Sequence, residues 1–538
     1  MIRYIFLILC AVSYTVLCDE TAIVEIPNGK LQGSFNGQYY SFKGIPYAEP
    51  PVGENRFESP KPFQQKWSDV RDATKSGATC ICLDPVEKVH EKIITGSEDC
   101  LFINVYSPKI KTTSLLPVIF FIHGGGFMFG SGDFLEETLL MSKGNFVFVT
   151  FNYRLGPLGF MSTEDGEITG NMGLKDQRLA LEWVNQNIEK FGGDPKHVLM
   201  AGFSAGGASV EYQLLQPGVE KLVNSAYSLS GSALDSWAFK TNVLEKVKKV
   251  ASILKCPNTE SSAEIKKCLK EKPATEIVNS TNEFLIYNYH PLIVWAPSIE
   301  SPESKDAILT EAPKELIKKG KVTNVPYLSS FTSQDAGFLV AEILFKKEDG
   351  TTDLEYFNKN YKKLLPSMLL YEERFEDETE LDQYTEKLYK DNGISDGVVT
   401  MENFNKFIKL ATDESMTNGI KESWQLHSQY SSAPNYYYEY DYPAKIGLGN
   451  LFSNRTDINF GCVHGDDVFL MFNHALRDIS KLNDVEKRHS DNFMKLLETF
   501  VSKGVPHFGE IALPKNANLS KKVEYLHILE NEAVIEKL

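Results

Sequence analysis

A serine between two glycines lies in the first half of the chain, in the sequence Gly202-Phe203-Ser204-Ala205-Gly206. This G-x-S-x-G pattern follows a short apolar run and precedes a stretch that can begin a helix. Glycine at the two outer positions removes Cβ atoms where a strand and a helix approach at a tight turn, so the serine hydroxyl projects into a cleft. Although the five-residue pattern alone is common, its setting predicts that Ser204 is a nucleophile for acyl transfer.

A run of three glycines, residues 124–126, follows His123 at the end of another apolar run. Consecutive glycines allow backbone N–H groups to converge on one point, and the oxyanion of a tetrahedral intermediate needs two or three such donors. We therefore expect the N–H groups of Gly125, Gly126 and Ala205 to form an oxyanion hole. A phosphate-binding loop is the alternative, but no Lys-Ser or Lys-Thr pair follows the glycines and dinucleotide-binding spacing is absent.

The serine needs a general base, and the chain contains ten histidines. His464 is the candidate because it lies in a glycine-flanked loop late in the chain, where folds with this kind of nucleophile turn place their histidine. His197 precedes the strand that leads to Ser204, and His123 precedes the glycine run. We expect both of these histidines to be structural.

The segments around these residues alternate between short apolar runs and helical patterns. Four runs suit strands that are buried on both faces, at residues 118–122, 146–151, 198–201 and 325–328. Between the second and the third run, a helical pattern begins at Asp176 and stops at Gly192-Gly193. Residues 22–42 contain two Asn-Gly pairs and predict antiparallel hairpins. The chain is therefore expected to be α/β, with a large, mostly parallel sheet flanked by helices.

Composition and charge narrow the possible functions. The 538 residues are 42% hydrophobic and 24% charged, which is typical of a globular protein, and their length suits one enlarged domain or two domains. The net charge of −16 opposes a nucleic acid partner, because proteins that bind nucleic acid gain affinity from clustered Lys and Arg. Nucleic acid is therefore excluded as a partner.

Residues 1–18 predict a signal peptide, with Arg3 as a short positive region, an apolar run and small residues before the cleavage point. A membrane anchor is the alternative, but an anchor needs about 20 consecutive apolar residues. Residues 13–15 are Ser, Tyr and Thr, which end the apolar run early, and no later stretch is apolar enough to span a bilayer. We expect the mature domain, residues 19–538, to be secreted without a membrane anchor.

The cysteines that remain after residue 18 agree with export, because disulfides form in oxidising compartments. Cys256 and Cys268 flank a short helical stretch, and either Cys80 or Cys82 can reach Cys100. Three sequons predict N-glycosylation, at Asn279, Asn454 and Asn518.

Longer motifs lie on both sides of the glycine-rich segments. They read G-I-P-Y-A at residues 44–48, S-E-D-C-L at 97–101, N-Y-R-L-G-P-L-G-F at 152–160 and G-N-M-G-L-K-D-Q at 170–177. Together these motifs resemble the type-B carboxylesterases, and among them the insect esterases, over almost all of the mature chain. The resemblance implies an α/β-hydrolase fold and the hydrolysis of small-molecule carboxylic esters, with no cofactor and no metal.

The resemblance also assigns individual residues. It implies two disulfides, Cys80 with Cys100 and Cys256 with Cys268. It further implies that Trp237 is the substrate-binding aromatic residue of the acyl pocket, with ordinary packing in the core as the alternative.

Two positions depart from the family pattern. Phe203 lies where many active members carry Glu, His or Gln, which argues against a juvenile hormone esterase. Active relatives have Glu followed by Gly as the triad acid, whereas this chain reads Gln334-Asp335-Ala336-Gly337. Matching the glycines puts Ala336 in the acid position and breaks the triad. The ungapped register, which we prefer, puts Asp335 there, and an aspartate can orient an imidazole as a glutamate does.

The predicted function is that of a secreted serine carboxylesterase, in which His464 deprotonates Ser204 and an acyl-enzyme is then hydrolysed. The alternative is a catalytically impaired binding or scavenger protein, because the family includes adhesion proteins that have lost catalysis. Those members lack the serine or the histidine and add a transmembrane segment. A cholinesterase is not expected, because the loop from Cys80 to Cys100 contains no tryptophan to hold a quaternary ammonium group.

Overall fold

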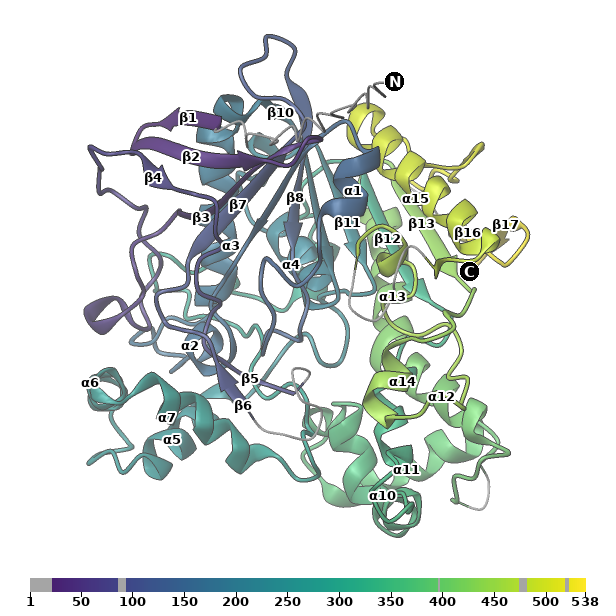
Figure 1. Ribbon diagram of the computed structural model, residues 1–538. Helices are drawn as coiled ribbons and strands as arrows, with labels where there is room; N and C mark the ends of the chain where they lie inside the picture. The colour runs from purple at the N-terminus through teal and green to yellow at the C-terminus, as the bar shows by residue number, and fades with distance from the viewer. Residues whose placement is uncertain (1–21, 86–92, 395–396, 474–480, 518–521) are drawn as a thin grey trace, which may run out of the picture.

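The computed structural model describes residues 22–85, 93–394, 397–473, 481–517 and 522–538. The predicted signal peptide and Asn518 lie outside the described residues. A sheet of 13 strands crosses the molecule (Figure 1), in the order β1-β2-β3-β7-β9-β8-β10-β11-β12-β13-β16-β17, with β4 beside β2. Its strands are β1 (Ala22–Ile26), β2 (Gly29–Phe35), β3 (Tyr40–Pro46), β4 (Arg71–Asp72), β7 (Phe102–Ser107), β8 (Leu116–Ile122), β9 (Val147–Phe151), β10 (Gly193–Phe203), β11 (Ser225–Leu229), β12 (Tyr327–Thr332), β13 (Asn435–Tyr440), β16 (Glu524–Ile528) and β17 (Ala533–Lys537).

Two small hairpins lie outside this sheet, β5 (Cys82–Asp84) with β6 (Ile93–Thr95) and β14 (His507–Phe508) with β15 (Ile511–Ala512). The α-helices are α1 (Thr138–Lys143), α2 (Gly156–Phe160), α3 (Met172–Asn187), α4 (Ala205–Leu214), α5 (Val243–Ile253), α6 (Ser262–Glu271), α7 (Ala274–Asn279), α8 (Pro313–Lys318), α9 (Gly337–Ala341), α10 (Leu354–Met368), α11 (Glu378–Asp391), α12 (Phe404–Thr412), α13 (Asn418–Tyr430), α14 (Leu448–Ser453) and α15 (Asp484–Lys503).

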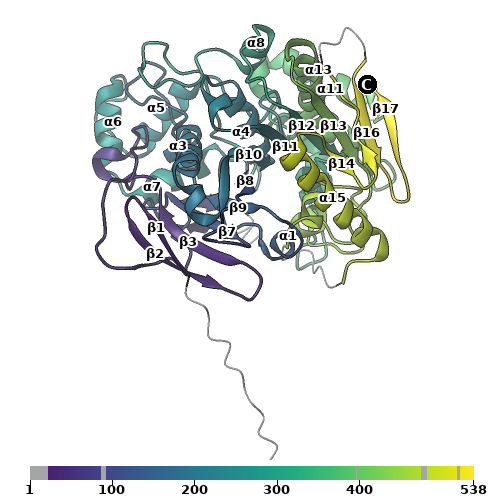
Figure 2. The ribbon, with the colours of Figure 1, turned by 90° about the horizontal axis from the view of Figure 1, so that it is seen from above.

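Helices cover both faces of the sheet, as Figure 2 shows, with α3, α4 and α13 on one face and α1 and α15 on the other. All of β9 and the last six residues of β10 are buried, which is typical of strands covered on both sides. Helices α5 to α7 and α10 to α12 gather at one end of the sheet (Figure 1). The predicted α/β architecture and the N-terminal antiparallel hairpins are confirmed.

The sheet is more mixed than the sequence predicts. In the sheet order, the strands from β9 through β16 run parallel, and such strands need crossover connections. On the other side of β9, each neighbouring pair in the series β1, β2, β3, β7 and β9 is antiparallel. A final antiparallel strand, β17, pairs with β16. The parallel part is therefore the centre of the sheet, and it carries the predicted functional residues.

Two predicted boundaries are wrong. The run at residues 325–328 predicts a strand that in fact covers Tyr327–Thr332, because hydroxyl side chains continue it: Ser329 is buried and accepts a hydrogen bond from Trp424 Nε1 (2.8 Å). The helix predicted from Asp176 begins at Met172. Asp176 therefore lies within the helix, where it is buried and pairs with Arg154 (2.7 Å) from outside the helix. In both elements, polar side chains that are buried with partners interrupt the hydrophobic pattern, so this pattern does not show where the element begins or ends.

The structure contains the two disulfides that the resemblance implies, Cys80–Cys100 and Cys256–Cys268. Cys80, and not Cys82, is therefore the partner of Cys100. Among the described residues, no helix has the length and apolar character needed to cross a membrane.

Candidate active site

The register of the central strands brings the predicted site together at the carboxyl end of the sheet. Gly202 on β10 lies beside Ile122 on β8, so the glycine run that follows β8 begins next to Ser204. On the other side of β10, Phe203 lies beside Leu229 on β11. Segments that are distant in sequence therefore meet here because parallel strands end at the same edge of a sheet.

Ser204 occupies the sharp turn between β10 and α4, with φ of 61° and ψ of −122°. A Cβ atom at Gly202 would collide with the Gly206 carbonyl, and one at Gly206 would collide with the Ile122 carbonyl. A hydrogen bond from the Ser204 N–H to the Leu229 carbonyl (2.8 Å) holds the turn. Such a strained conformation, maintained by its surroundings, is a feature of nucleophile turns.

The glycine run packs directly against this turn. Gly125 and Gly126 have positive φ values of 107° and 60°, which glycine adopts without strain. Both line the same cavity as Ser204. Ala205 is the first residue of α4, where backbone N–H groups have no acceptor within the helix. The three predicted oxyanion donors therefore lie around the serine.

His464 and Asp335 form a buried pair. His464 Nδ1 is hydrogen bonded to Asp335 Oδ1, and neither side chain is more than 4% exposed. The other carboxylate oxygen, Oδ2, accepts hydrogen bonds from the Ser230 hydroxyl (2.7 Å) and from the Thr332 N–H (2.9 Å). The carboxylate is thus held through both oxygens, as a group that must orient an imidazole requires.

The structure brings Asp335, and not Ala336, to the histidine. The buried Ala336 donates its N–H to the Thr412 hydroxyl (3.1 Å) at the end of α12. The backbone at Asp335 also contacts the loop that contains His464, because the His464 N–H donates to the Asp335 carbonyl (3.1 Å). This close approach compensates for a side chain that is one methylene shorter than glutamate.

Two phenylalanines that the sequence analysis did not place in this role pack against the imidazole. The Phe203 ring lies 4.5 Å from the His464 ring and the Phe338 ring lies 5.1 Å from it, measured between centroids. The two rings restrict the orientation of the imidazole. Phe203 was identified in the sequence only as a departure from the family, and Phe338 gave no signal because its contact with His464 spans more than 120 residues.

Ser204 and His464 line one cavity of about 80 Å³, whose remaining walls are apolar apart from glycine backbone. Trp237 lies in this wall, and its Nε1 donates to Met416 Sδ (3.1 Å). Trp237 is also 3% exposed, so it both packs in the core and faces the cavity.

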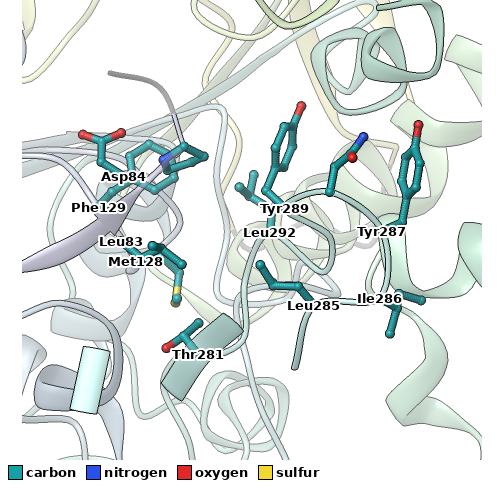
Figure 3. Close-up of a pocket in the computed structure, with 12 residues that line it drawn as sticks. Leu83, Asp84, Met128, Phe129, Thr281, Leu285, Ile286, Tyr287, Tyr289 and Leu292 are labelled. Carbon is teal, nitrogen blue, oxygen red and sulfur yellow. The ribbon is translucent and has the colours of Figure 1, made fainter. Parts of the chain in front are cut away.

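A second pocket, of about 330 Å³, adjoins this cavity and shares Phe129 and Leu292 with it. Figure 3 shows its walls, with Met128 and Phe129 on one side and Ile286 and Tyr287 on the other. The pocket combines apolar walls with hydroxyl groups, an amide and the carboxyl group of Asp84, unlike the apolar cavity beside Ser204. No motif in the sequence pointed to this pocket.

Another buried carboxyl group, that of Asp467, lies three residues after His464. Burial raises the pKa of Asp467 to about 6; a hydrogen bond from the Tyr438 hydroxyl (2.8 Å) opposes the rise and the negative charge of Asp335 adds to it.

Burial lowers the pKa of His123 to about 4, and the ring of His123 stacks on Tyr153 at 4.3 Å between centroids. His123 is therefore neutral near pH 7 and packs as the structural residue that the sequence predicts.

Helix α4 is anchored on its buried side by Glu211. This carboxylate accepts hydrogen bonds from His427 Nε2 (2.9 Å) and from the hydroxyls of Ser232 (2.7 Å) and Ser423 (2.6 Å). Burial by itself raises the pKa of Glu211, but the contacts with His427 and the two hydroxyls bring it below its ordinary value. The cluster fixes α4, the helix that follows Ser204, to α13.

Replacing His427 by alanine should lower the free energy of unfolding by about 3–5 kcal/mol near pH 7, because the buried Glu211 carboxylate loses its imidazole partner. The lowered pKa of Glu211 means that this stabilisation is present above its ordinary pKa of 4.5 and is lost as the pH falls. Urea denaturation should therefore show a smaller difference between variant and parent in acid. Ser423→Ala, which removes one neutral donor, is the control and should cost about 1.5–3 kcal/mol. Equal stability of His427→Ala and parent near pH 7 would contradict the assignment.

A model of the carboxylesterase family matches residues 20–538. The chain belongs to the carboxylesterase family. Esterase-5B of Drosophila persimilis is 39% identical to this carboxylesterase over 517 residues, which cover 95% of this chain and 94% of the relative. Esterase P of Drosophila melanogaster is 39% identical over 515 residues, with the same coverage of 95% and 94%.

Two solved structures resemble this esterase. A PNB esterase is 26% identical with a TM-score of 0.71, and the two chains are covered to 96% and 97%. The juvenile hormone esterase from Manduca sexta, with OTFP covalently attached, is 25% identical with a TM-score of 0.79 and the same coverage. The predicted α/β-hydrolase fold and type-B family are confirmed, and the esterase is a carboxylic ester hydrolase.

Proposed function

We propose that this esterase hydrolyses carboxylic esters with small apolar acyl groups through a Ser204, His464 and Asp335 triad and an acyl-enzyme. The observation that carries the proposal is that His464 is bonded to the buried Asp335 and lines the same cavity as Ser204. Because Nδ1 is occupied by Asp335, Nε2 of His464 is the nitrogen that accepts the serine proton.

In the first half of the reaction, His464 takes the Ser204 proton while the serine oxygen attacks the ester carbonyl carbon. The carbonyl electron pair moves to oxygen, and the N–H groups of Gly125, Gly126 and Ala205 stabilise the resulting oxyanion. When the tetrahedral intermediate collapses, the C–O bond to the alcohol breaks. His464 returns its proton to the departing alkoxide, so that an alcohol and an acyl-enzyme result.

In the second half, a water molecule takes the place of the alcohol. His464 removes a proton from this water, the hydroxide attacks the acyl carbon, and the same three N–H groups hold the second oxyanion. Collapse then releases the carboxylic acid and returns the proton to the Ser204 oxygen. Throughout both halves, the ionised Asp335 orients the imidazole and stabilises its cation.

The small apolar cavity predicts a preference for short acyl chains. In a panel of p-nitrophenyl esters of increasing acyl length, we expect kcat/KM to be highest for short acyl groups and to fall about 10-fold or more toward the octanoate, because the small cavity beside Ser204 has little room for extra methylenes. Replacing Trp237 by alanine enlarges the cavity and should raise kcat/KM for the octanoate relative to the butanoate.

Trp237→Phe is the matched control for this experiment, because it keeps an aromatic side chain in the wall. The control should retain the order of acyl preference of the parent. An unchanged octanoate-to-butanoate ratio in Trp237→Ala would show that Trp237 does not limit the acyl group.

The proposal includes secretion. Two disulfides support an oxidising compartment, and the sequons at Asn279 and Asn454 lie at exposed positions. Secretion predicts that protein collected from the medium of an expressing eukaryotic culture begins at residue 19 and loses mass on treatment with an N-glycosidase. Retention in the cells with residues 1–18 still attached would contradict it.

A further inference from the structure

We propose that Gln334 is a positioning residue that allows an aspartate to serve as the triad acid. The inference rests on the proposed triad, and it concerns how the acid turn is held against the histidine loop. The acid turn is defined here as residues 332–336 and the histidine loop as residues 460–465.

Gln334 joins the two segments through both its backbone and its side chain. Its N–H donates to the Cys462 carbonyl (3.0 Å), and its side-chain Oε1 accepts from the Cys462 N–H (2.8 Å). The Ser333 hydroxyl, which also contacts the Asp441 carboxylate, lies 2.9 Å from the same Oε1. The side chain therefore supplies the acceptor for a backbone N–H that lies two residues before His464.

Gly461 makes room for this amide. The residue has a φ of 81°, and a Cβ atom there would collide with Oε1 of Gln334 and lie 2.7 Å from its Cγ. No other residue type fits this position without moving the glutamine. The side chain of Gln334 and the bare backbone of Gly461 are thus complementary.

These contacts align the loop so that His464 meets the acid. Beyond Cys462, the next contact is the hydrogen bond from the His464 N–H to the Asp335 carbonyl, which places the imidazole beside the carboxylate. Asp335 Oδ2 is already fixed by Ser230 and Thr332 from the other side. Aspartate reaches less far than glutamate, so it loses contact with the imidazole if the histidine loop moves away. The loop must therefore be held in place, and Gln334 holds it.

Replacing Gln334 by methionine keeps the volume of the side chain but removes the acceptor. We expect kcat to fall about 10–100-fold with little change in KM, because a shift on the order of 1 Å in a catalytic group can cost that much. Gln334→Glu keeps an acceptor oxygen in the same place and should restore most of the activity. Gly461→Ala, which displaces the amide, should lower kcat by a similar factor.

Combination with Asp335→Asn separates positioning from general damage to the fold. If Gln334 acts through Asp335, the Gln334→Met change should have little further effect on kcat in the Asp335→Asn background. A purely structural role would lower kcat by the same factor in both backgrounds, and that result would overturn the inference.

Parental kcat in folded Gln334→Met would also overturn it. If Gln334→Met yields no folded protein, Gly461→Ala decides, and parental kcat in that variant overturns the inference as well. Failure of the proposed triad can be distinguished from failure of this inference, because without the triad Asp335→Asn alone would be as active as the parent.

Discussion

Replacing Ser204 by alanine should lower kcat for p-nitrophenyl butanoate on the order of 10⁵-fold, because the variant has no oxygen nucleophile to form the acyl-enzyme. The residual rate would come from substrate binding and from the oxyanion donors, which the change leaves in place. Steady-state kinetics of the purified variant measure the effect. The fold should survive, because alanine is smaller than serine and the turn is set by Gly202 and Gly206.

Circular dichroism and thermal unfolding of Ser204→Ala are the controls for this experiment, and both should match the parent. Ser209→Ala, which alters a buried hydroxyl further along α4, is a matched variant outside the cavity and should retain most of the activity. Activity of Ser204→Ala within a few-fold of the parent would mean that the nucleophile is elsewhere.

Replacing Asp335 by asparagine should lower kcat by a factor on the order of 10²–10⁴. Asparagine has nearly the same shape, but a neutral amide cannot stabilise the imidazole cation and favours the wrong tautomer of His464. Its remaining oxygen can still accept from Ser230 or Thr332, so the fold should persist. Comparison of kcat between the variant and the parent at saturating substrate measures the loss.

The rival register assigns the acid position to Ala336, and it leads to the opposite results. If that register held, Asp335→Asn would change little and Ala336→Glu would raise turnover. In this structure Ala336 contacts Thr412 and not the histidine, so we expect Ala336→Glu to place a charge in a buried site and to destabilise the protein. Higher kcat in Ala336→Glu than in the parent would refute the assignment of Asp335.

The parts of the site that the sequence predicts are those whose signal is local. The turn at Ser204 and the glycine run depend on small residues at fixed spacing, and the order of the chain then favours His464. Asp335 was open to two registers, because no local pattern states which side chain reaches a histidine 129 positions away. Only the contact between the acid turn and the histidine loop distinguishes Asp335 from Ala336.

The same reason explains what the sequence analysis missed. Phe338 and Gln334 act on the histidine loop through contacts between distant segments, and the walls of the second pocket come from three separate parts of the chain. For the fold, apolar runs located β8, β9 and β10, but β12 was misplaced because three of its last four residues are buried hydroxyl residues. Hydrophobic pattern alone does not reveal polar residues that become buried with partners.

The most direct test of the triad is covalent labelling of the esterase with an organophosphate, followed by peptide mass spectrometry. We expect one phosphoryl group per chain, carried by the peptide that contains Ser204, and a loss of esterase activity in proportion to labelling. The same treatment of Ser204→Ala should leave the protein unlabelled. A stoichiometric adduct on another residue, or full activity in protein that is completely labelled at Ser204, would contradict the proposal.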